Sequence, residues 1–320
     1  MVYVAFTDKP RAEEARRWLV SRRLLAPGYA PVHDEEHGKV GFPVVRRLEE
    51  VDALVSGVRR MHLPKRPEPL PVRVPYDVVG GVALIKEGFR GVRYASEASK
   101  IMAVNKNIST VYVKVGAVSG VERVPRLKLV AGRGEPVTVH RENGLSFKLD
   151  VERTYFNPRL ATERRRLACE VGSGDYVLDM FTGVGPFAVT VAKFSCARVD
   201  AVDVNPVAYS YLVENIHRNR VGHAVTPFLC DAAAFSSDRL YSQVIMNLPF
   251  SSLNYLGVAL RLTRPGAVIH VYSAKPPSEA EPAITAICED LRGEPPSKIT
   301  WRPVFEYAPR REVVRFDVHL

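Results

Sequence analysis

The sequence predicts an α/β protein in three parts, of which the last is a doubly wound, Rossmann-like sheet with mostly parallel strands. From about residue 151, apolar strands alternate with helical segments, as in "DYVLDMF" followed by "PFAVTVAKF". Such alternation is typical of a parallel sheet covered by helices on both faces. A proline-rich stretch separates a front region of different composition. The length of 320 residues suits two or three domains.

The order of segments along the chain gives the expected domain boundaries. Residues 1–63 read as strand, helix and short strands, which predicts a small α+β domain. Residues 64–75 hold five prolines and form an extended linker. Residues 76–150 predict a β-rich domain with one helix at about 93–104, since alternating apolar residues and glycines dominate. Residues 151–320 form the doubly wound domain.

Charge and cysteine content limit the class of protein. Residues 1–150 carry 26 basic against 17 acidic residues, whereas the remainder carries 19 against 18. A basic front joined to a nearly neutral back favours a nucleic-acid partner. The four cysteines form no CxxC pair, so we expect no metal site and a reduced, cytoplasmic location. Neither a signal peptide nor a membrane span is expected.

A glycine turn follows the first strand of the doubly wound part, in "DMFTGVGPF". Gly183 and Gly185 let the backbone approach a ligand, but the third glycine of a dinucleotide fingerprint is missing. Asp203 and Asp231 end the next two strands, where one acid can hold ribose hydroxyls and the other an adenine amino group. Two acids without a phosphate cradle favour a nucleoside such as S-adenosylmethionine, and Asp179 suits its amino end. The alternative is a structural turn with incidental acids.

The candidate cofactor residues all lie in or after these strands. They are Asp179, Phe181, Gly183, Val184, Gly185, Phe187, Asp203, Val204, Asn205, Asp231 and Asn247.

The fourth strand of this part ends in "MNLPF". Asn247 offers two donors and one acceptor there, and Pro249 restricts the backbone. Methyltransferases that act on exocyclic amines carry an Asn-Pro-Pro-aromatic motif at this place. This sequence has Leu248 in place of the first proline, so it matches the motif only in part. The alternative is a polar cap on the strand end.

The stretch "TYFNPRLATERRRLAC" predicts a helix at the start of the doubly wound part. Asn157 is a good N-cap and Pro158 a good first residue. Arg159 and Glu163 are four residues apart and share a face, so an ion pair between them is the simple interpretation. Glu163 also flanks the apolar stripe, where a side chain is half buried and faces a cleft. Arg164 projects into that stripe without an evident partner.

Seven ordered motifs between about Val121 and Arg310 together resemble the archaeal and eukaryotic tRNA (guanine-37-N1)-methyltransferase family. They are "GVERVPRLKLVAG", "HRENG", "TYFNPRLATER", "DMFTGVGPF", "VDVNP", "MNLP" and "YAPR". The earlier "PYDVVGGVALI" is similar too, while the first 60 residues match only in size and basic character.

The resemblance implies a class I methyltransferase domain that uses S-adenosylmethionine, a β-rich RNA-binding middle domain and a small N-terminal domain. It implies tRNA as partner, bound at the anticodon arm and outer corner. We expect a monomer, and the sequence leaves assistance by a metal ion open. Glu163 falls on the general base and Arg123 on the arginine at guanine O6. The positions around the flipped guanosine or its backbone are Tyr155, Asn157, Arg159, Asn247 and Pro249.

Other functions remain open at this point. A related enzyme of the wybutosine pathway would act on the same nucleoside, by transferring an aminocarboxypropyl group or by methylating a tricyclic base. "MNLP" together with Glu163 favours N1 methylation, although a bifunctional enzyme would keep both. A non-catalytic RNA-binding protein would be expected to lose the base or the glycine turn, and both are present.

Overall fold

The computed structural model describes residues 1–48, 54–64, 71–89, 91–116, 125–308 and 310–320. The chain divides into two compact units, Met1–Pro71 and Val72–Leu320. The division falls inside the proline-rich stretch, and each unit is described by itself. In the described part of the chain, no helix has the length and apolar character needed to cross a membrane.

The first unit is a four-stranded antiparallel sheet with one helix. The strand order is β2-β3-β1-β4, and the elements are β1 (Val2–Asp8), η1 (Lys9–Arg11), α1 (Ala12–Ser21), β2 (Val32–Asp34), β3 (Lys39–Val44) and β4 (Gly57–Met61). Ala15 and Leu19 of α1 are buried in a cluster with residues of β1 and β3. The strand β4 was not expected, because arginines occupy two of its five positions.

The second unit begins with a four-stranded sheet of order β5-β6-β7-β8. Its elements are β5 (Tyr76–Val79), β6 (Val82–Lys86), α2 (Tyr94–Val104), β7 (Thr110–Lys114) and β8 (Leu127–Gly132). Strands β6 and β7 are parallel, so the chain crosses over between them through α2. Ala98 and Ile101 of α2 pack with Ile85 and Val111 of the sheet. The helix confirms the one predicted at 93–104.

The rest of the unit is built on a seven-stranded sheet of order β13-β12-β11-β14-β15-β17-β16. The first five strands in this order are parallel to one another, while β17 is antiparallel to both of its neighbours. The strands are β11 (Tyr176–Asp179), β12 (Arg198–Asp203), β13 (Val225–Leu229), β14 (Tyr241–Met246), β15 (Thr263–Ser273), β16 (Lys298–Ala308) and β17 (Arg311–His319). The predicted doubly wound, mostly parallel sheet is therefore confirmed.

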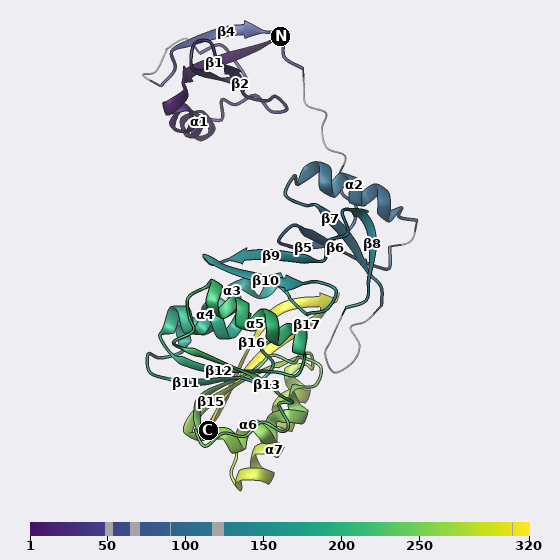
Figure 1. Ribbon diagram of the computed structural model, residues 1–320, viewed down its shortest axis with the longest axis vertical. Coiled ribbons are helices and arrows are strands. Elements are labelled where there is room, and N and C mark those ends of the chain that lie inside the picture. The colour runs from purple at the N-terminus through teal and green to yellow at the C-terminus, as the bar shows by residue number, and fades with distance from the viewer. Residues whose placement is uncertain (49–53, 65–70, 90, 117–124, 309) are drawn as a thin grey trace. The chain divides into compact units, whose positions relative to one another are not determined.

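Helices cover both faces of this sheet (Figure 1). One layer holds η2 (Pro158–Leu160), α3 (Ala161–Glu170), α4 (Pro186–Ser195) and α5 (Pro206–Arg218); the other holds η3 (Ser252–Tyr255), α6 (Leu256–Leu262) and α7 (Pro277–Arg292). Each layer has its own apolar core against the sheet. The chain leaves β13 on one side of β11 and returns as β14 on the other, so the order reverses between β11 and β14. Ligands of such sheets bind at the carboxyl ends of the strands near this reversal.

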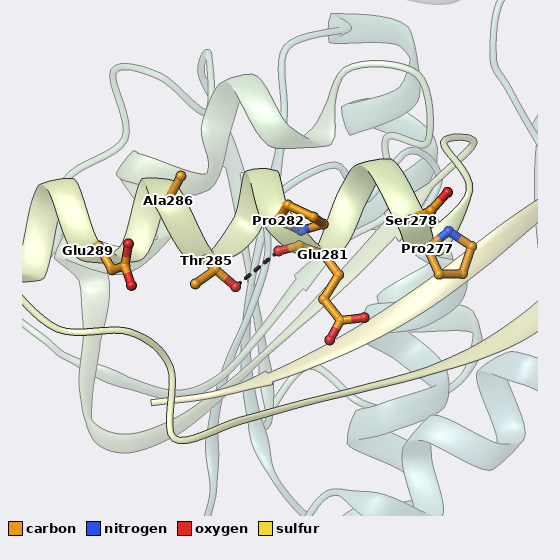
Figure 2. A pocket seen from close by; sticks show the side chains of 7 residues that line it. All are labelled: Pro277, Ser278, Glu281, Pro282, Thr285, Ala286 and Glu289. Atoms are coloured by element: carbon orange, nitrogen blue, oxygen red, sulfur yellow. Dashed lines mark hydrogen bonds between the residues drawn. The ribbon is translucent and has the colours of Figure 1, made fainter.

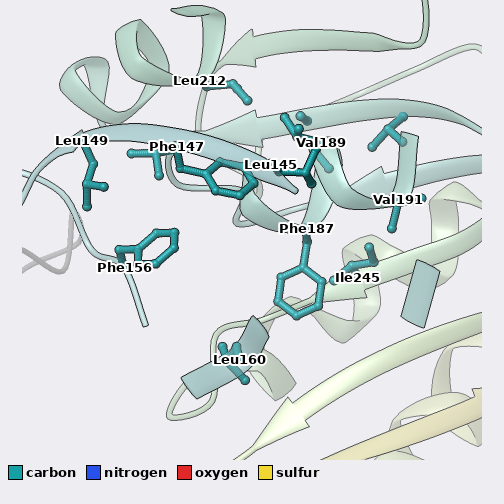
Figure 3. Packing of buried hydrophobic residues seen from close by; sticks show 14 of the residues in the cluster. Leu145, Phe147, Leu149, Phe156, Leu160, Phe187, Val189, Val191, Leu212 and Ile245 are labelled. Atoms are coloured by element: carbon teal, nitrogen blue, oxygen red, sulfur yellow. The ribbon is translucent and has the colours of Figure 1, made fainter. Parts of the chain in front are cut away.

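A hairpin of β9 (Val137–Glu142) and β10 (Leu145–Asp150) joins the two sheets of the second unit. The side chains of Thr138 and His140 in β9 accept hydrogen bonds from the backbone N–H groups of Gly81 and Gly80. These two glycines form the turn between β5 and β6 of the four-stranded sheet, called the middle sheet below. On the other side, Asn215 of α5 bonds both backbone groups of Lys148, at 2.7 and 3.0 Å. The apolar side chains of β10 enter the core formed by α3 and α4 (Figure 3). In its packing, the hairpin thus belongs with the seven-stranded sheet as much as with the middle sheet.

Candidate active site

The glycine turn after β11 has a backbone that only glycine adopts readily. Gly183 and Gly185 have φ angles of 57° and 89°, in the left-handed region. A Cβ on Gly185 would lie 2.5 Å from Cδ1 of Leu212, so a side chain there would clash with α5. The N–H of Gly183 donates to Asp203 Oδ2 at 2.6 Å, which ties the turn to the end of β12.

Asp179, the last residue of β11, is a buried carboxylate with no counter-charge among the described residues. Its exposed fraction is 1%, and neither oxygen has a hydrogen-bond partner in the described part of the chain. Burial, and then the nearby charge of Asp203, raise its pKa to about 7. The hydroxyl of Thr182 is buried as well, near enough to Asp179 to oppose this shift, and forms no hydrogen bond of normal geometry within the described residues. Such orphaned polar groups beside a glycine turn suit a ligand that carries an amino group, which is what the predicted cofactor has.

The other predicted cofactor residues fall into two groups. Val184 and Phe187 lie in the apolar core, and Asn205 caps α5 through the N–H groups of Val207 and Ala208. Phe181, Val204 and Asp231 reach the surface to different degrees at the ends of β11, β12 and β13. The buried residues of the first group therefore support the turn and the strand ends, whereas the accessible residues of the second group can contact a ligand.

Asn247 and Pro249 follow β14, on the other side of the reversal in strand order. Met246 is in register with Val271, so Asn247 comes next to Tyr272 at the carboxyl end of β15. The carbonyl of Pro249 accepts from the N–H of Ala274 at 2.8 Å, which fixes this loop against the loop after β15. Asn247 is partly exposed, so its amide can still meet a substrate.

The segment before α3 lies over the glycine turn. A Cβ built on Gly183 would be 3.7 Å from the carbonyl oxygen of Tyr155, so the backbone of Tyr155 passes close to the turn. Asn157 caps the helix as predicted, by accepting from the N–H of Arg159 at 3.0 Å. The first turn is a 3-10 turn, and α3 continues from it. Tyr155 thus stands between the glycine turn and the middle sheet.

Arg159 and Glu163 do not form the ion pair that their spacing allowed as the simple interpretation. Arg159 instead donates from Nε and Nη2 to Asp77 Oδ1 of β5, both at 2.8 Å. Because the helix starts with a 3-10 turn, Arg159 and Glu163 do not lie on one face as they would in a regular α-helix. The carboxylate of Asp77 lies beside Arg159 instead.

Glu163 is more deeply buried than its flank position predicted, with an exposed side-chain fraction of 3%. Its Oε1 accepts from the hydroxyl of Tyr272 at 3.0 Å and from Nη1 of Arg315 at 2.8 Å. Its Oε2 accepts from Nη1 of Arg166 at 2.8 Å, and the Arg166 side chain is 43% exposed. One oxygen is therefore fixed by buried groups, and the other is held by a surface side chain.

Arg315 of β17 centres an ion cluster that sequence reasoning missed. It is fully buried and contacts Glu163, Glu170 and Asp317. His270 Nδ1 lies 2.6 Å from Asp317 Oδ1. Burial alone would raise the pKa of Asp317, but hydrogen bonds from His270 and Arg315 hold it well below its usual range. The signal was present, because two charged residues interrupt the apolar strand "VVRFDVHL".

Arg164 has a buried carboxylate partner. Its Nε and Nη2 donate to the two oxygens of Glu142 in β9 at 2.6 and 2.5 Å, and its guanidinium also donates to the carbonyl of Asn157 at 3.2 Å. Burial raises the pKa of Glu142, but hydrogen bonds from His140 and Arg164 outweigh this and lower it. "HRENG" is therefore structural here, and it fastens α3 to the hairpin.

Arg123 falls outside the described residues. A surface hollow of about 500 Å³ runs along α7 on the opposite helix layer and holds none of the predicted site residues (Figure 2). A small cavity of about 50 Å³ adjoins the candidate site, since Tyr155 and Lys114 both line it.

The strand order, the glycine turn and the polar strand ends on both sides of the reversal define a class I methyltransferase fold. The model of the family described as the TRM5/TYW2 methyltransferase domain matches residues 138–289. A tRNA (guanine(37)-N(1))-methyltransferase, Trm5b, of Pyrococcus abyssi is 39% identical over 79% of this chain and 74% of its own length. The chain belongs to the TRM5/TYW2 methyltransferase family.

Two further relatives show the range of this family. The structure described as the complex of aTrm5 and tRNALeu aligns over all of both chains with a TM-score of 0.72 and 26% identity. A tRNA(Phe) (4-demethylwyosine(37)-C(7)) aminocarboxypropyltransferase of Pyrococcus horikoshii is 31% identical over 57% of this chain and 65% of its own length. The likeness to Trm5b is thus higher and covers more of both chains.

Proposed function

We propose that this enzyme transfers the methyl group of S-adenosylmethionine to N1 of guanosine 37 in tRNA. The observation that carries the proposal is the setting of the Glu163 carboxylate. One of its oxygens is held by Tyr272 and Arg315 near the carboxyl ends of the strands. Tyr272 in turn lies beside the loop that carries Asn247. The likeness to Trm5b over most of the chain supports the same reaction.

N1 of guanine carries a proton that has to leave when the new N–C bond forms. The bound cofactor supplies an electrophilic methyl group on sulfur. A carboxylate that accepts the N1 proton contributes about 10²–10⁴-fold to such a reaction. Glu163 is the proposed acceptor, and Arg123 is proposed to stabilise the negative charge that builds on O6.

The contacts of Glu163 indicate which oxygen accepts the proton. Oε1 is held by Tyr272 and Arg315, which are both fully buried. Oε2 is held by Arg166 alone, and that side chain can move into solvent. We infer that guanine displaces Arg166 and that N1–H then faces Oε2. Tyr272 and Arg315 keep the carboxylate in place while this happens.

The cofactor is proposed to sit across the glycine turn. Asp179 receives the amino group of its methionine end, since this buried carboxylate lacks a partner in the described chain. Asp203 and Asp231 lie at the ends of β12 and β13 for the ribose and the adenine. Tyr155, Asn157, Arg159, Asn247 and Pro249 surround the flipped guanosine or its backbone in this proposal, and the middle sheet contacts the anticodon arm.

Two differently labelled cofactors test the reaction. Methyl-labelled and carboxyl-labelled S-adenosylmethionine are each incubated with a G37 tRNA transcript and with its A37 counterpart. We expect the methyl label in 1-methylguanosine from the G37 transcript, and no label in the A37 transcript. Transfer of the carboxyl label would instead identify aminocarboxypropyl transfer, the alternative that the second relative raises. Absence of both labels from the G37 transcript would contradict the proposal.

A further inference from the structure

Three cations surround a single carboxylate where the middle sheet meets β16. Asp77 Oδ2 accepts from Nζ of Lys114 at 3.1 Å, and Oδ1 accepts from Arg159 at 2.8 Å. Nζ of Lys86 lies 3.5 Å from the carbonyl oxygen of Tyr307. Burial, and then repulsion from Arg159 and Lys114, lower the pKa of Lys86. The cluster thus keeps two positive charges in excess, which suits a phosphate.

An aromatic pair adjoins this cluster. Phe250 follows the Asn247–Pro249 loop and is 66% exposed, and its ring meets that of Tyr307 edge to face at 5.4 Å. The carbonyl of Glu306, next to Tyr307, accepts from Nη1 of Arg159 at 3.5 Å. The cations and the rings therefore share the end of β16 and form one continuous surface.

The position of this surface relates it to the target nucleoside. Lys114 lines the same small cavity as Tyr155, the residue that lies over the glycine turn. Phe250 is three residues from Asn247. Both ends of the surface thus lead to the proposed guanosine site.

We propose that Lys86, Lys114, Arg159, Phe250 and Tyr307 bind one single-stranded nucleotide that flanks the target guanosine. The cations hold its phosphate and Phe250 stacks on its base. Stacking of this kind needs an unpaired base, accepts any base, and is typical of proteins that bind RNA loops. The inference rests on the proposed function, because it takes the RNA at this site to be the substrate.

The test compares substitutions in the full-length chain. Phe250→Ala removes the stacking ring, Phe250→Trp keeps one, and Lys86→Gln removes one charge. The matched controls are Trp301→Ala and Lys298→Gln, which alter exposed residues of the same types toward the other end of β16. For each variant we would measure the tRNA dissociation constant over a range of salt, S-adenosylmethionine binding and Tm.

We expect Phe250→Ala to weaken tRNA binding about five- to a hundredfold without changing the salt slope, and Phe250→Trp to restore it. The logarithm of the tRNA association constant falls with the logarithm of salt concentration. Lys86→Gln should make this negative slope shallower by about 0.7–0.9, as loss of one phosphate contact does. Cofactor binding and Tm should stay as in the controls. In a tRNA with 2-aminopurine next to position 37, binding to the wild-type protein should quench the fluorescence of this base. The quenching should be lost in Phe250→Ala.

Several results would overturn this inference. One is that Phe250→Ala and Lys86→Gln bind tRNA as the controls do. Another is that the variant with weaker tRNA binding also has a lower Tm or weaker cofactor binding. The Phe250 ring would then only stabilise the contact between its loop and β16. Failure of the wild-type chain to methylate the G37 transcript would instead count against the proposed function, so the two failures are distinguishable.

Discussion

Glu163 and Arg164 are neighbours on α3, yet they enter two different buried ion clusters. Arg164 meets Glu142 in a closed pair, with both carboxylate oxygens engaged by one guanidinium. Glu163 is held by three donors from three elements, and one of them, Arg166, is a surface side chain. The closed pair can only fasten α3 to the hairpin, whereas the cluster around Glu163 can release one donor and accept another. Substitutions in the two clusters should therefore separate stability from catalysis.

The largest effect is expected from Glu163→Gln. The amide keeps the size and one acceptor but cannot take a proton, so single-turnover methyl transfer should fall by about 10²–10⁴-fold. Glu170→Gln is the matched control, because Glu170 contacts the same Arg315 and is a surface-accessible carboxylate. The measurement is the quench-flow rate with saturating cofactor. Equal rates for the two variants would remove the proposed role of Glu163.

Arg164→Met should affect stability instead. It leaves the buried carboxylate of Glu142 without its guanidinium, and breaking such a pair costs about 3–5 kcal/mol of unfolding free energy. Urea denaturation measures this loss. Removing both charges with Arg164→Met and Glu142→Gln should recover part of it. A double variant no more stable than the single one would mean that the pair does not carry the penalty.

Asp179 adds a third buried charge, one without a partner in the described chain. With a pKa of about 7 it is mostly protonated at pH 6 and ionised at pH 7.5. Only the ionised form attracts an amino group, so S-adenosylmethionine should bind roughly five- to tenfold more tightly at pH 7.5 than at pH 6. Calorimetric titration at both values checks this. In Asp179→Asn the dependence should disappear; an unchanged dependence would assign it to another group.

The smallest effect is expected from Arg166→Gln. A partly exposed ion pair contributes about 0–1 kcal/mol, and this one has to break before guanine reaches Oε2. The methylation rate should therefore rise by up to about fivefold, with Tm nearly unchanged. A large fall in rate would show that Arg166 takes part in the reaction rather than giving way to the substrate.

Local features of α3 could be predicted from sequence, whereas its partners could not. The cap at Asn157 depends on neighbouring residues, so it was found. The partner of Arg159 is 82 positions away, and the two buried donors to Glu163 are 109 and 152 positions away. Spacing within the helix therefore suggested a pair that the structure does not form. Arg164 looked misplaced because its carboxylate lies in the hairpin, 22 residues earlier.

In the candidate site, too, features set by the local sequence could be predicted, whereas contacts between distant residues could not. The glycine turn and the acids at the strand ends are set by the strand pattern, and the structure places them at the reversal in strand order. Tyr272 and Arg315 were missed because they lie on strands that carry no recognisable motif. Charged residues within the buried strand β17 were the available sign of an internal ion cluster.

The hairpin β9–β10 also has a consequence for how the chain unfolds. Side chains of β9 accept from the backbone N–H groups of Gly80 and Gly81, and the amide side chains of Asn215 and Asn219 pair with backbone groups of β10. Loss of the hairpin would leave these two N–H groups unpaired on one side and would expose the apolar core around α4 on the other. Residues 72–320 should therefore melt as a single cooperative unit, and a fragment cut between β8 and β9 would leave two pieces that each lack part of their own hydrogen bonding.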